Sequence, residues 1–168
     1  MEPITSLRAT RHFTAAPVTR DQVTAVLEAA RWAGSARNRQ PWRFVVVRDR
    51  GLLRELSLLG AYAGHLAGAP VAILLAVDAT LSTEDAEFDA GRAAQNLMLA
   101  AHVLGMGSCP ASFYPAANAG RATARAGLRE PWRIRTAISL GHPAPPPEGT
   151  SAIPRGRLPL ADLVIELS

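Results

Sequence analysis

An uninterrupted apolar run, Val71–Val77, is the feature of this sequence that most constrains its fold. Seven consecutive apolar residues after Pro70 lack the alternation of a half-exposed strand, so the run suits a strand that is buried on both faces. Such a strand must be central in its sheet. With 168 residues, the chain is long enough for one domain with its own core.

The segment that begins near residue 82 is the second strong constraint. Ser82 with Asp85 offers a helix cap, and the acidic residues there suit the positive start of a helix that runs to Leu104 and stops at Gly105. From Leu97 onward this helix is apolar nearly all round, and the residues before it are rich in Ala and Gly. We therefore expect it to be buried and tightly packed, and it is a candidate for the spine of a dimer.

Local patterns predict the other elements. Thr19 and Gln22 form a capping box before apolar residues at helical spacing, whereas short β-branched runs indicate strands. Because strands and helices alternate, the chain is predicted to form a layered α/β or α+β domain. The expected elements are a helix over 19–33, a buried strand over 44–47, a short helix over 51–59, a strand or extended loop over 107–113, a helix after Pro115, a strand over 134–140 and a proline-rich linker or arm over 142–149.

Composition narrows the classes of partner and cofactor. The single Cys109 excludes an internal disulfide and fits a reducing cytoplasm, and the four histidines lack metal-ligand spacing, so no metal site is expected. The first residues have no apolar signal-peptide core, and no uncharged run is long enough to span a membrane. The net charge of +4 comes from arginines spread along the chain. We therefore expect a cytoplasmic protein that binds neither membranes nor nucleic acid.

Two pairs of arginines are candidate anion-binding groups. Arg8 and Arg11 are three residues apart, so they share a face if their segment is helical. Arg155 and Arg157 point to the same side if the backbone there is extended. Since the planar guanidinium group matches phosphate geometry, each pair is a candidate clamp for one anion. Taken alone, the first pair also fits a solvated helix face, and the second fits a basic tail.

An uncharged polar loop lies between the first predicted helix and strand. Ser35, Asn38 and Gln40 supply hydrogen-bond donors and acceptors, which suit the edge of a heterocycle or a polyol. Turn and cap chemistry around Gly34 and Pro41 explains the same residues without a ligand. No Gly-x-Gly-x-x-Gly turn follows a strand, so neither a Rossmann dinucleotide site nor a P-loop is expected.

In chain order, these segments resemble the nitroreductase family of flavoproteins. That family opens with an Arg-Arg-Ser-x-Arg-x-Phe motif, continues through Asn-x-Gln-Pro-Trp-x-Phe after a helix, and closes with a basic-x-Arg-x-Pro-Leu segment. The chain departs from this pattern at Leu7 (usually Arg), Ala9 (usually Ser) and Gly34 (usually Pro). The matching segments are residues 8–13 (RATRHF), 30–44 (ARWAGSARNRQPWRF), 89–101 with the glycine turn at 104–108, and 155–160 (RGRLPL).

The resemblance implies an α+β, three-layer α-β-α nitroreductase-like fold with a mixed, mainly antiparallel sheet, in an intertwined homodimer. It implies one flavin-binding domain over residues 1–168, with the proline-rich segment 142–160 as an arm toward the partner subunit. FMN would bind between the subunits. Arg8, Arg155 and Arg157 would hold its phosphate; Arg11 would stabilise the reduced ring from the N1 and O2 edge; Ser35, Asn38 and Gln40 would reach the ring or ribityl chain; and the backbone at Ala111 and Ser112 would offer an amide to N5.

The resemblance also implies the activity, that of an NAD(P)H-dependent flavin oxidoreductase. A hydride would pass from NAD(P)H through flavin N5 to a nitroaromatic, quinone or similar acceptor, by a ping-pong mechanism at one site. The flavin does this chemistry, so no further catalytic side chain is required. The alternatives are a deazaflavin-using or flavin-fragmenting member of the same fold, a non-catalytic flavin-binding protein, and an arginine-rich binding module without enzyme activity.

Overall fold

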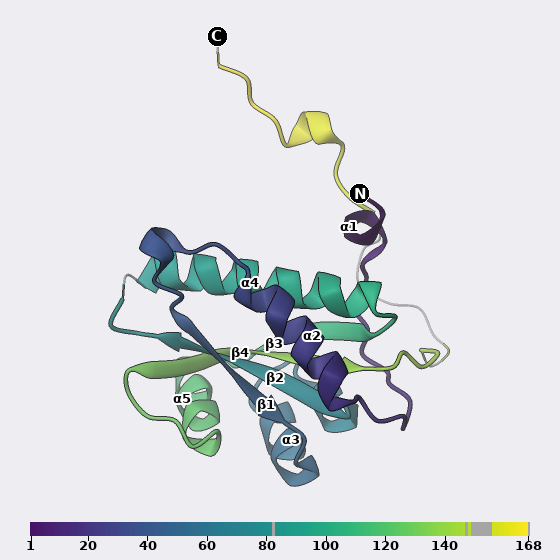
Figure 1. The fold of residues 1–168 in the computed structure, drawn as a ribbon, viewed down its shortest axis with the longest axis vertical. Helices are drawn as coiled ribbons and strands as arrows, with labels where there is room; N and C mark the ends of the chain where they lie inside the picture. The colour runs from purple at the N-terminus through teal and green to yellow at the C-terminus, as the bar shows by residue number, and fades with distance from the viewer. Residues whose placement is uncertain (82, 147, 149–155, 168) are drawn as a thin grey trace.

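A four-stranded antiparallel sheet forms the middle layer of the molecule (Figure 1). The computed structural model describes residues 1–168 except 82, 147, 149–155 and 168. The strand order is β1-β2-β4-β3, and all three pairings between these strands are antiparallel. The strands are β1 (Trp42–Val47), β2 (Val71–Asp78), β3 (Gly107–Ser112) and β4 (Trp132–Gly141).

Helices cover both faces of this sheet. In Figure 1, α2 and α4 lie over one face, and α3 and α5 lie over the other. This arrangement confirms the predicted α+β fold with three layers. The helices are α1 (Glu2–Ser6), α2 (Arg20–Arg31), α3 (Arg50–Ser57), α4 (Thr83–Val103) and α5 (Ala116–Arg125), with short 3₁₀ turns η1 (Ala36–Asn38), η2 (Gly64–Gly68) and η3 (Leu160–Asp162).

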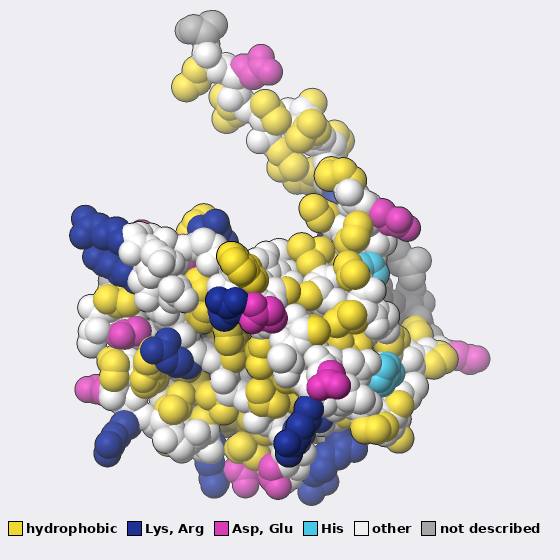
Figure 2. Space-filling view, in the orientation of Figure 1, with side chains coloured by type: hydrophobic (Ala, Val, Ile, Leu, Met, Phe, Trp, Pro, Cys, Tyr) yellow, Lys and Arg dark blue, Asp and Glu magenta, His cyan; other side chains and the backbone are white. Residues whose placement is uncertain are grey.

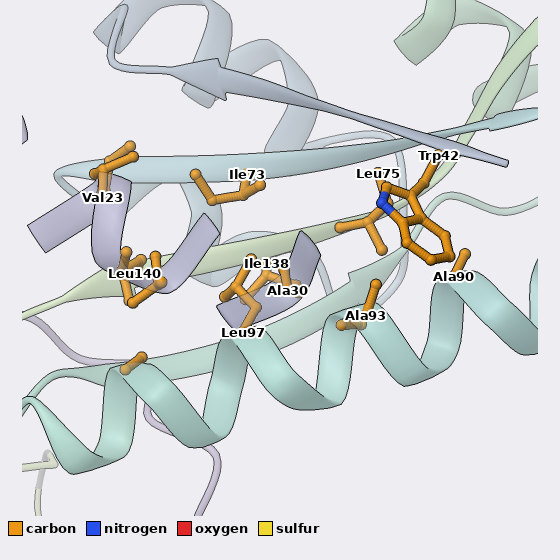
Figure 3. Packing of buried hydrophobic residues seen from close by; sticks show 14 of the residues in the cluster. Val23, Ala30, Trp42, Ile73, Leu75, Ala90, Ala93, Leu97, Ile138 and Leu140 are labelled. Atoms are coloured by element: carbon orange, nitrogen blue, oxygen red, sulfur yellow. The ribbon is translucent and has the colours of Figure 1, made fainter. Parts of the chain in front are cut away.

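Strand β2 is buried on both faces, as its continuous apolar run predicts. Ile73 and Leu75 point into the core beneath α2 and α4, where Leu97 meets them (Figure 3). Ala72 and Leu74 point the other way, into the core beneath α3 and α5. Every residue from 71 to 77 is buried, so alternate side chains of this single strand join two separate apolar cores.

The capping box at the start of α2 is present as predicted. The Thr19 hydroxyl accepts a hydrogen bond from the Gln22 backbone N–H at 3.1 Å, and the Gln22 side chain accepts one from the Thr19 N–H at 2.9 Å. These two bonds satisfy donors that the first turn of a helix leaves free. The helix ends at Arg31, earlier than the predicted residue 33.

Strand β1 corrects the expectation of a buried strand over 44–47. It is an edge strand, paired only with β2 within the described residues. Its ends, Trp42 and Val47, are buried, but Val46 keeps 40% of its surface exposed. β-Branched residues fit any pleated surface, so their presence predicted the strand but not its place in the sheet.

Helix α4 corrects the expectation of a helix buried all round. One face, which includes Ala90, Ala93 and Leu97, packs on the sheet and on α2 (Figure 3). The small alanine side chains let these layers approach closely. On the other face Phe88 and Val103 are each 68% exposed. Within one chain, therefore, α4 presents apolar surface that the rest of the subunit does not cover.

The C-terminal segment is a second exposed apolar surface. Residues 156–167 project away from the layered body (Figure 1), and hydrophobic side chains line this projection (Figure 2). Leu160, Leu163 and Ile165 are 74%, 62% and 89% exposed. The predicted cap at Ser82 lies outside the described residues.

We predict that Leu74→Ala lowers the free energy of unfolding by about 2–5 kcal/mol, because it leaves a cavity in a tightly packed core. Leu74 is fully buried. The matched control is Leu58→Ala, at a leucine that is 82% exposed, where a change within about 0.5 kcal/mol is expected. Chemical denaturation at one fixed protein concentration measures both, and equal losses in the two variants would contradict the assignment of the core.

Candidate functional site

Two groups of candidate residues lie toward opposite ends of α4. Near its start, the Asp89 carboxylate accepts a hydrogen bond from the backbone N–H of Ala36 at 2.8 Å, which ties the polar loop to the helix. At its end, His102 Nε2 lies 2.7 Å from the hydroxyl of Ser6, two residues before Arg8. A helix rises about 1.5 Å per residue, so these attachment points are about 20 Å apart. The polar loop and the segment before Arg8 are therefore attached at well separated places along α4.

The polar loop at 35–40 holds an unusual backbone conformation. Arg37, Asn38 and Gln40 have φ angles of 52°, 54° and 50°, in the left-handed region that side chains other than glycine seldom adopt. The loop is closed by a bond of 2.9 Å from the Gln40 N–H to Ser35 Oγ, and the Gln40 side chain donates to Asn38 Oδ1 at 3.2 Å. Strain of this kind is typical of binding sites. The three predicted residues of this loop do lie together.

Asp89 is a site residue that sequence reasoning missed. Its side chain is buried, with only 4% of the residue exposed, and it lies 3.6 Å from Arg92 Nη1 as well as bonding to Ala36. A Cβ on Gly34 would lie 2.8 Å from Arg92 Nη2, so glycine makes room for this arginine beside the loop. The only signal for Asp89 in the sequence was an acidic residue within an alanine-rich predicted helix.

The segment from Arg8 to Phe13 is not helical. Helix α1 ends at Ser6, after which Ala9 forms a bridge with Ser108 of β3. The Thr10 N–H donates to the Ser108 carbonyl at 2.8 Å, so pairing with a distant strand replaces helical bonding. Arg8 donates to the carbonyls of Thr5 and Leu7, at 2.7 and 2.8 Å. Without a helix, Arg8 and Arg11 lose the shared face that their spacing implied.

Arg11 comes two residues after Ala9, which pairs with Ser108 of β3. Burial lowers the pKa of His65, the positive charge of Arg11 lowers it further, and a backbone hydrogen bond to Pro110 opposes both. Burial raises the pKa of the Cys109 thiol, and the charge of Arg11 partly opposes that rise. His65 Nδ1 lies 2.8 Å from Ser139 Oγ, which donates to the Cys109 carbonyl at 3.3 Å. His65 and Ser139 carried no local signal, because residues 65, 109 and 139 meet only through the fold.

Ala111 and Ser112 follow Cys109 on the same strand. Ala111 is buried and Ser112 is exposed. A Cβ on Gly60 would lie 2.3 Å from the Ser112 carbonyl oxygen, so the chain after α3 packs directly against this backbone. The predicted backbone segment thus lies on the strand whose residue Ser108 pairs with Ala9.

The structure describes one arginine of the predicted C-terminal clamp, Arg157, which lies on the segment that projects from the layered body. Arg157 is exposed, and its Nη1 donates to the Gly156 carbonyl at 2.8 Å. Arg155 lies outside the described residues. The backbone at Gly156 has a φ of 98°, which favours glycine.

A recess of about 350 Å³ opens beside the polar loop, between α2 and β1. Of the predicted site residues, Gln40 alone lines it. Among the described residues there is no group of three or more His, Cys, Asp or Glu side chains arranged for a metal ion. Nor does that part of the chain include a helix of the length and hydropathy needed to cross a membrane. The recess is lined by Thr24, Leu27, Glu28, Arg31, Gln40, Trp42, Arg43 and Phe44.

Known proteins match this chain in sequence. The Nitroreductase family model matches residues 4–59 and 54–142. A protein of Archaeoglobus fulgidus, provisionally named an NADH dehydrogenase/NAD(P)H nitroreductase, is 32% identical over 147 residues, which are 85% of this chain and 84% of that protein.

Solved structures agree with the sequence match. A provisionally named nitroreductase of Desulfovibrio desulfuricans, solved in complex with FMN, is 33% identical with a TM-score of 0.84, over 99% of this chain and 95% of that one. A provisionally named NADH oxidase of Clostridium acetobutylicum is 29% identical with a TM-score of 0.84, over 99% of both chains. The chain described here belongs to the nitroreductase family.

Proposed function

We propose that this chain is an FMN-dependent oxidoreductase whose cofactor site is completed by a second copy of the chain. The observation that carries the proposal is the separation of about 20 Å, along α4, between Asp89, which anchors the polar loop, and His102, which contacts Ser6 just before the arginine segment. We infer that a single subunit cannot bring both groups into contact with one flavin molecule. The FMN bound to the Desulfovibrio desulfuricans relative supports FMN over a deazaflavin.

The residues present fit this cofactor. FMN combines a phosphate with a polar heterocycle and a polyol chain. Arginines supply charged, forked donors for the phosphate. The strained loop holds Asn38 and Gln40 at the surface with their amide groups exposed to a ligand.

An antiparallel pairing of two α4 helices joins the two halves of the site. In a two-fold dimer the same surface of each subunit meets itself, so the start of one helix lies near the end of the other. The exposed faces of Phe88 and Val103 supply apolar surface for such pairing. The apolar C-terminal segment is then an arm toward the partner, in keeping with a single flavin-binding domain over residues 1–168 and an arm over 142–160.

Each group has a distinct role in this proposal. Arg8 and Arg157, with Arg155, bind the phosphate, whereas Arg11 presents positive charge to the N1 and O2 edge of the flavin ring. Ser35, Asn38 and Gln40 of the partner reach the ring or ribityl chain, and the backbone of Ala111 and Ser112 offers an amide to N5. Bound FMN supplies hydride acceptance and donation. NAD(P)H is the proposed donor, and a nitroaromatic, quinone or similar compound is the proposed acceptor.

The dimer is tested on the outer face of α4. We predict that Val103→Glu weakens both self-association and FMN binding, because it places charge in an apolar contact that completes the site. The wild-type chain should have twice its subunit mass of 17.8 kDa in light scattering. Leu58→Glu, at an exposed leucine on the opposite layer, serves as the control and should stay dimeric. A folded Val103→Glu monomer that binds FMN as tightly as the wild-type dimer would contradict the shared site.

The phosphate clamp is tested separately. We predict that Arg157→Ala weakens FMN binding roughly ten- to a hundredfold while the dimer remains folded, because one charged hydrogen bond is worth about 1.5–3 kcal/mol. Arg155→Ala should act in the same direction. Arg129→Ala, at another exposed arginine, is the control for loss of charge alone. FMN titrations that do not distinguish Arg157→Ala and Arg155→Ala from this control would remove both arginines from the site.

A further inference from the structure

Arg92 lies on α4, one turn after the aspartate that anchors the polar loop. Its guanidinium Nη1 lies 3.6 Å from Asp89 Oδ1, while Asp89 Oδ2 accepts the 2.8 Å hydrogen bond from the Ala36 backbone N–H. One buried carboxylate therefore contacts both the arginine and the loop. The guanidinium carbon also lies 5.9 Å from the centroid of the Phe88 ring, within the range of a cation–π interaction. These contacts hold the charge of Arg92 beside the polar loop.

Glycine at position 34 leaves the space that this placement requires. A Cβ on Gly34 would lie 2.8 Å from Arg92 Nη2 and 3.3 Å from Nη1. The backbone of Gly34 is not in the left-handed region that favours glycine, so space is the reason for glycine here. The proline that the nitroreductase family usually has at this position would fill the same space. The departure at Gly34 thus fits the presence of Arg92.

The guanidinium of Arg92 keeps N–H donors for a ligand. Its 3.6 Å separation from Asp89 is an ion-pair contact, longer than a hydrogen bond. The side chain is 49% exposed, and a guanidinium carries five N–H donors in a planar fork. Such a fork matches a carboxylate or another planar anion.

The chemistry of the loop indicates which ligand brings the negative charge. Ser35, Asn38 and Gln40 are uncharged and suit the flavin ring or its ribityl chain, and other arginines are proposed to bind the phosphate of FMN. NAD(P)H carries its phosphates beyond a ribose from its reacting ring. A small aromatic acceptor can instead carry a carboxylate on the ring that is reduced. A charge beside the loop therefore fits the acceptor.

We propose that Arg92 is a substrate-binding residue that selects aromatic acceptors with a carboxylate or a similar anionic group on the reacting ring. Gly34 is a positioning residue, because it acts on the acceptor only through the space that it leaves for Arg92. The proposal rests on the proposed function for the place of the loop beside the flavin. The arrangement of Gly34, Asp89 and Arg92 belongs to each chain by itself.

Two probes that differ by one charge test the selection, para-nitrobenzoate and its neutral amide, para-nitrobenzamide. Their binding to the oxidised, FMN-loaded protein is measured from the change in flavin absorption, without turnover. The wild-type protein should bind the carboxylate more tightly. Arg92→Gln should lower that preference by about tenfold or more, since one hydrogen bond to a charged group is lost. Arg92→Lys, which keeps the charge but not the fork, should recover part of it.

Gly34→Ala tests whether the space at this position matters. The new Cβ would meet the far end of a flexible side chain rather than backbone, so the chain should fold and the guanidinium should move. The preference should fall as it does in Arg92→Gln. In the Arg92→Gln background, Gly34→Ala should add little, because Gly34 acts only through Arg92. Losses that add in the double variant would overturn the role of Gly34.

Controls and contrary results are defined for the same titrations. Arg129→Gln, at an exposed arginine elsewhere, should keep the wild-type preference. FMN affinity in Arg92→Gln should change less than about fivefold, because its phosphate is bound by other residues. The proposal would be overturned by an equal preference in wild type and Arg92→Gln, or by a loss in this variant of FMN or NADH binding instead.

A measurement on the flavin-free protein separates this inference from the function on which it rests. In ¹H–¹⁵N spectra the Nε–H signal of Arg92 should shift when para-nitrobenzoate is added, but not when para-nitrobenzamide is added. Gly34→Ala should lose the shift. An Arg92 signal that does not respond to the carboxylate would overturn the proposal even if the protein binds FMN. A response in a protein that binds no FMN would contradict the proposed function and leave Arg92 as an anion-binding residue.

Discussion

The length of α4 is the constraint on which the rest of this account depends. The helix crosses one face of the sheet, packs there through small residues such as Ala90 and Ala93, and holds a different candidate binding segment toward each end. In the proposed site, this helix keeps the attachment points of the polar loop and of the segment before Arg8 apart. The exposed apolar face of the same helix provides a surface for a second copy of the chain. Pairing of the two copies would bring the loop of one beside the arginine segment of the other. In the proposed dimer, fold, assembly and cofactor binding therefore depend on one element.

The candidate site combines local strain with buried polar contacts. The loop holds three residues other than glycine at positive φ, and the buried Asp89 carboxylate anchors it through the Ala36 N–H. Elsewhere, the buried Nε2 of His65 has no hydrogen-bond partner among the described residues. Each of these features costs stability in the isolated chain. Such costs are typical where a protein prepares groups for a ligand before it arrives.

Sequence patterns predicted the features that depend on neighbouring residues. The continuous run at 71–77 predicted a central strand, and Thr19 with Gln22 predicted the start of α2. The sequence patterns did not predict the structure where contacts between distant segments determine it. Arg8 and Arg11 have the spacing of one helix face, but Ala9 and Thr10 between them pair with Ser108 of β3 instead. The β-branched run of β1 lies at an edge that only the strand order determines. Asp89 and His65 escaped notice for the same reason, because their partners are far away in the chain.

Mixed dimers test the shared site most directly. One chain would carry Arg8→Ala with Arg11→Gln, the other Asn38→Ala with Gln40→Ala, and differently tagged chains would be co-expressed and purified as the heterodimer. If each site takes its arginines from one subunit and its loop from the other, the heterodimer has one intact site and one doubly defective site. The account predicts one FMN per heterodimer, at a concentration where neither parent homodimer binds. A heterodimer that binds no FMN would contradict it, because every site built within a single chain would then carry a defect.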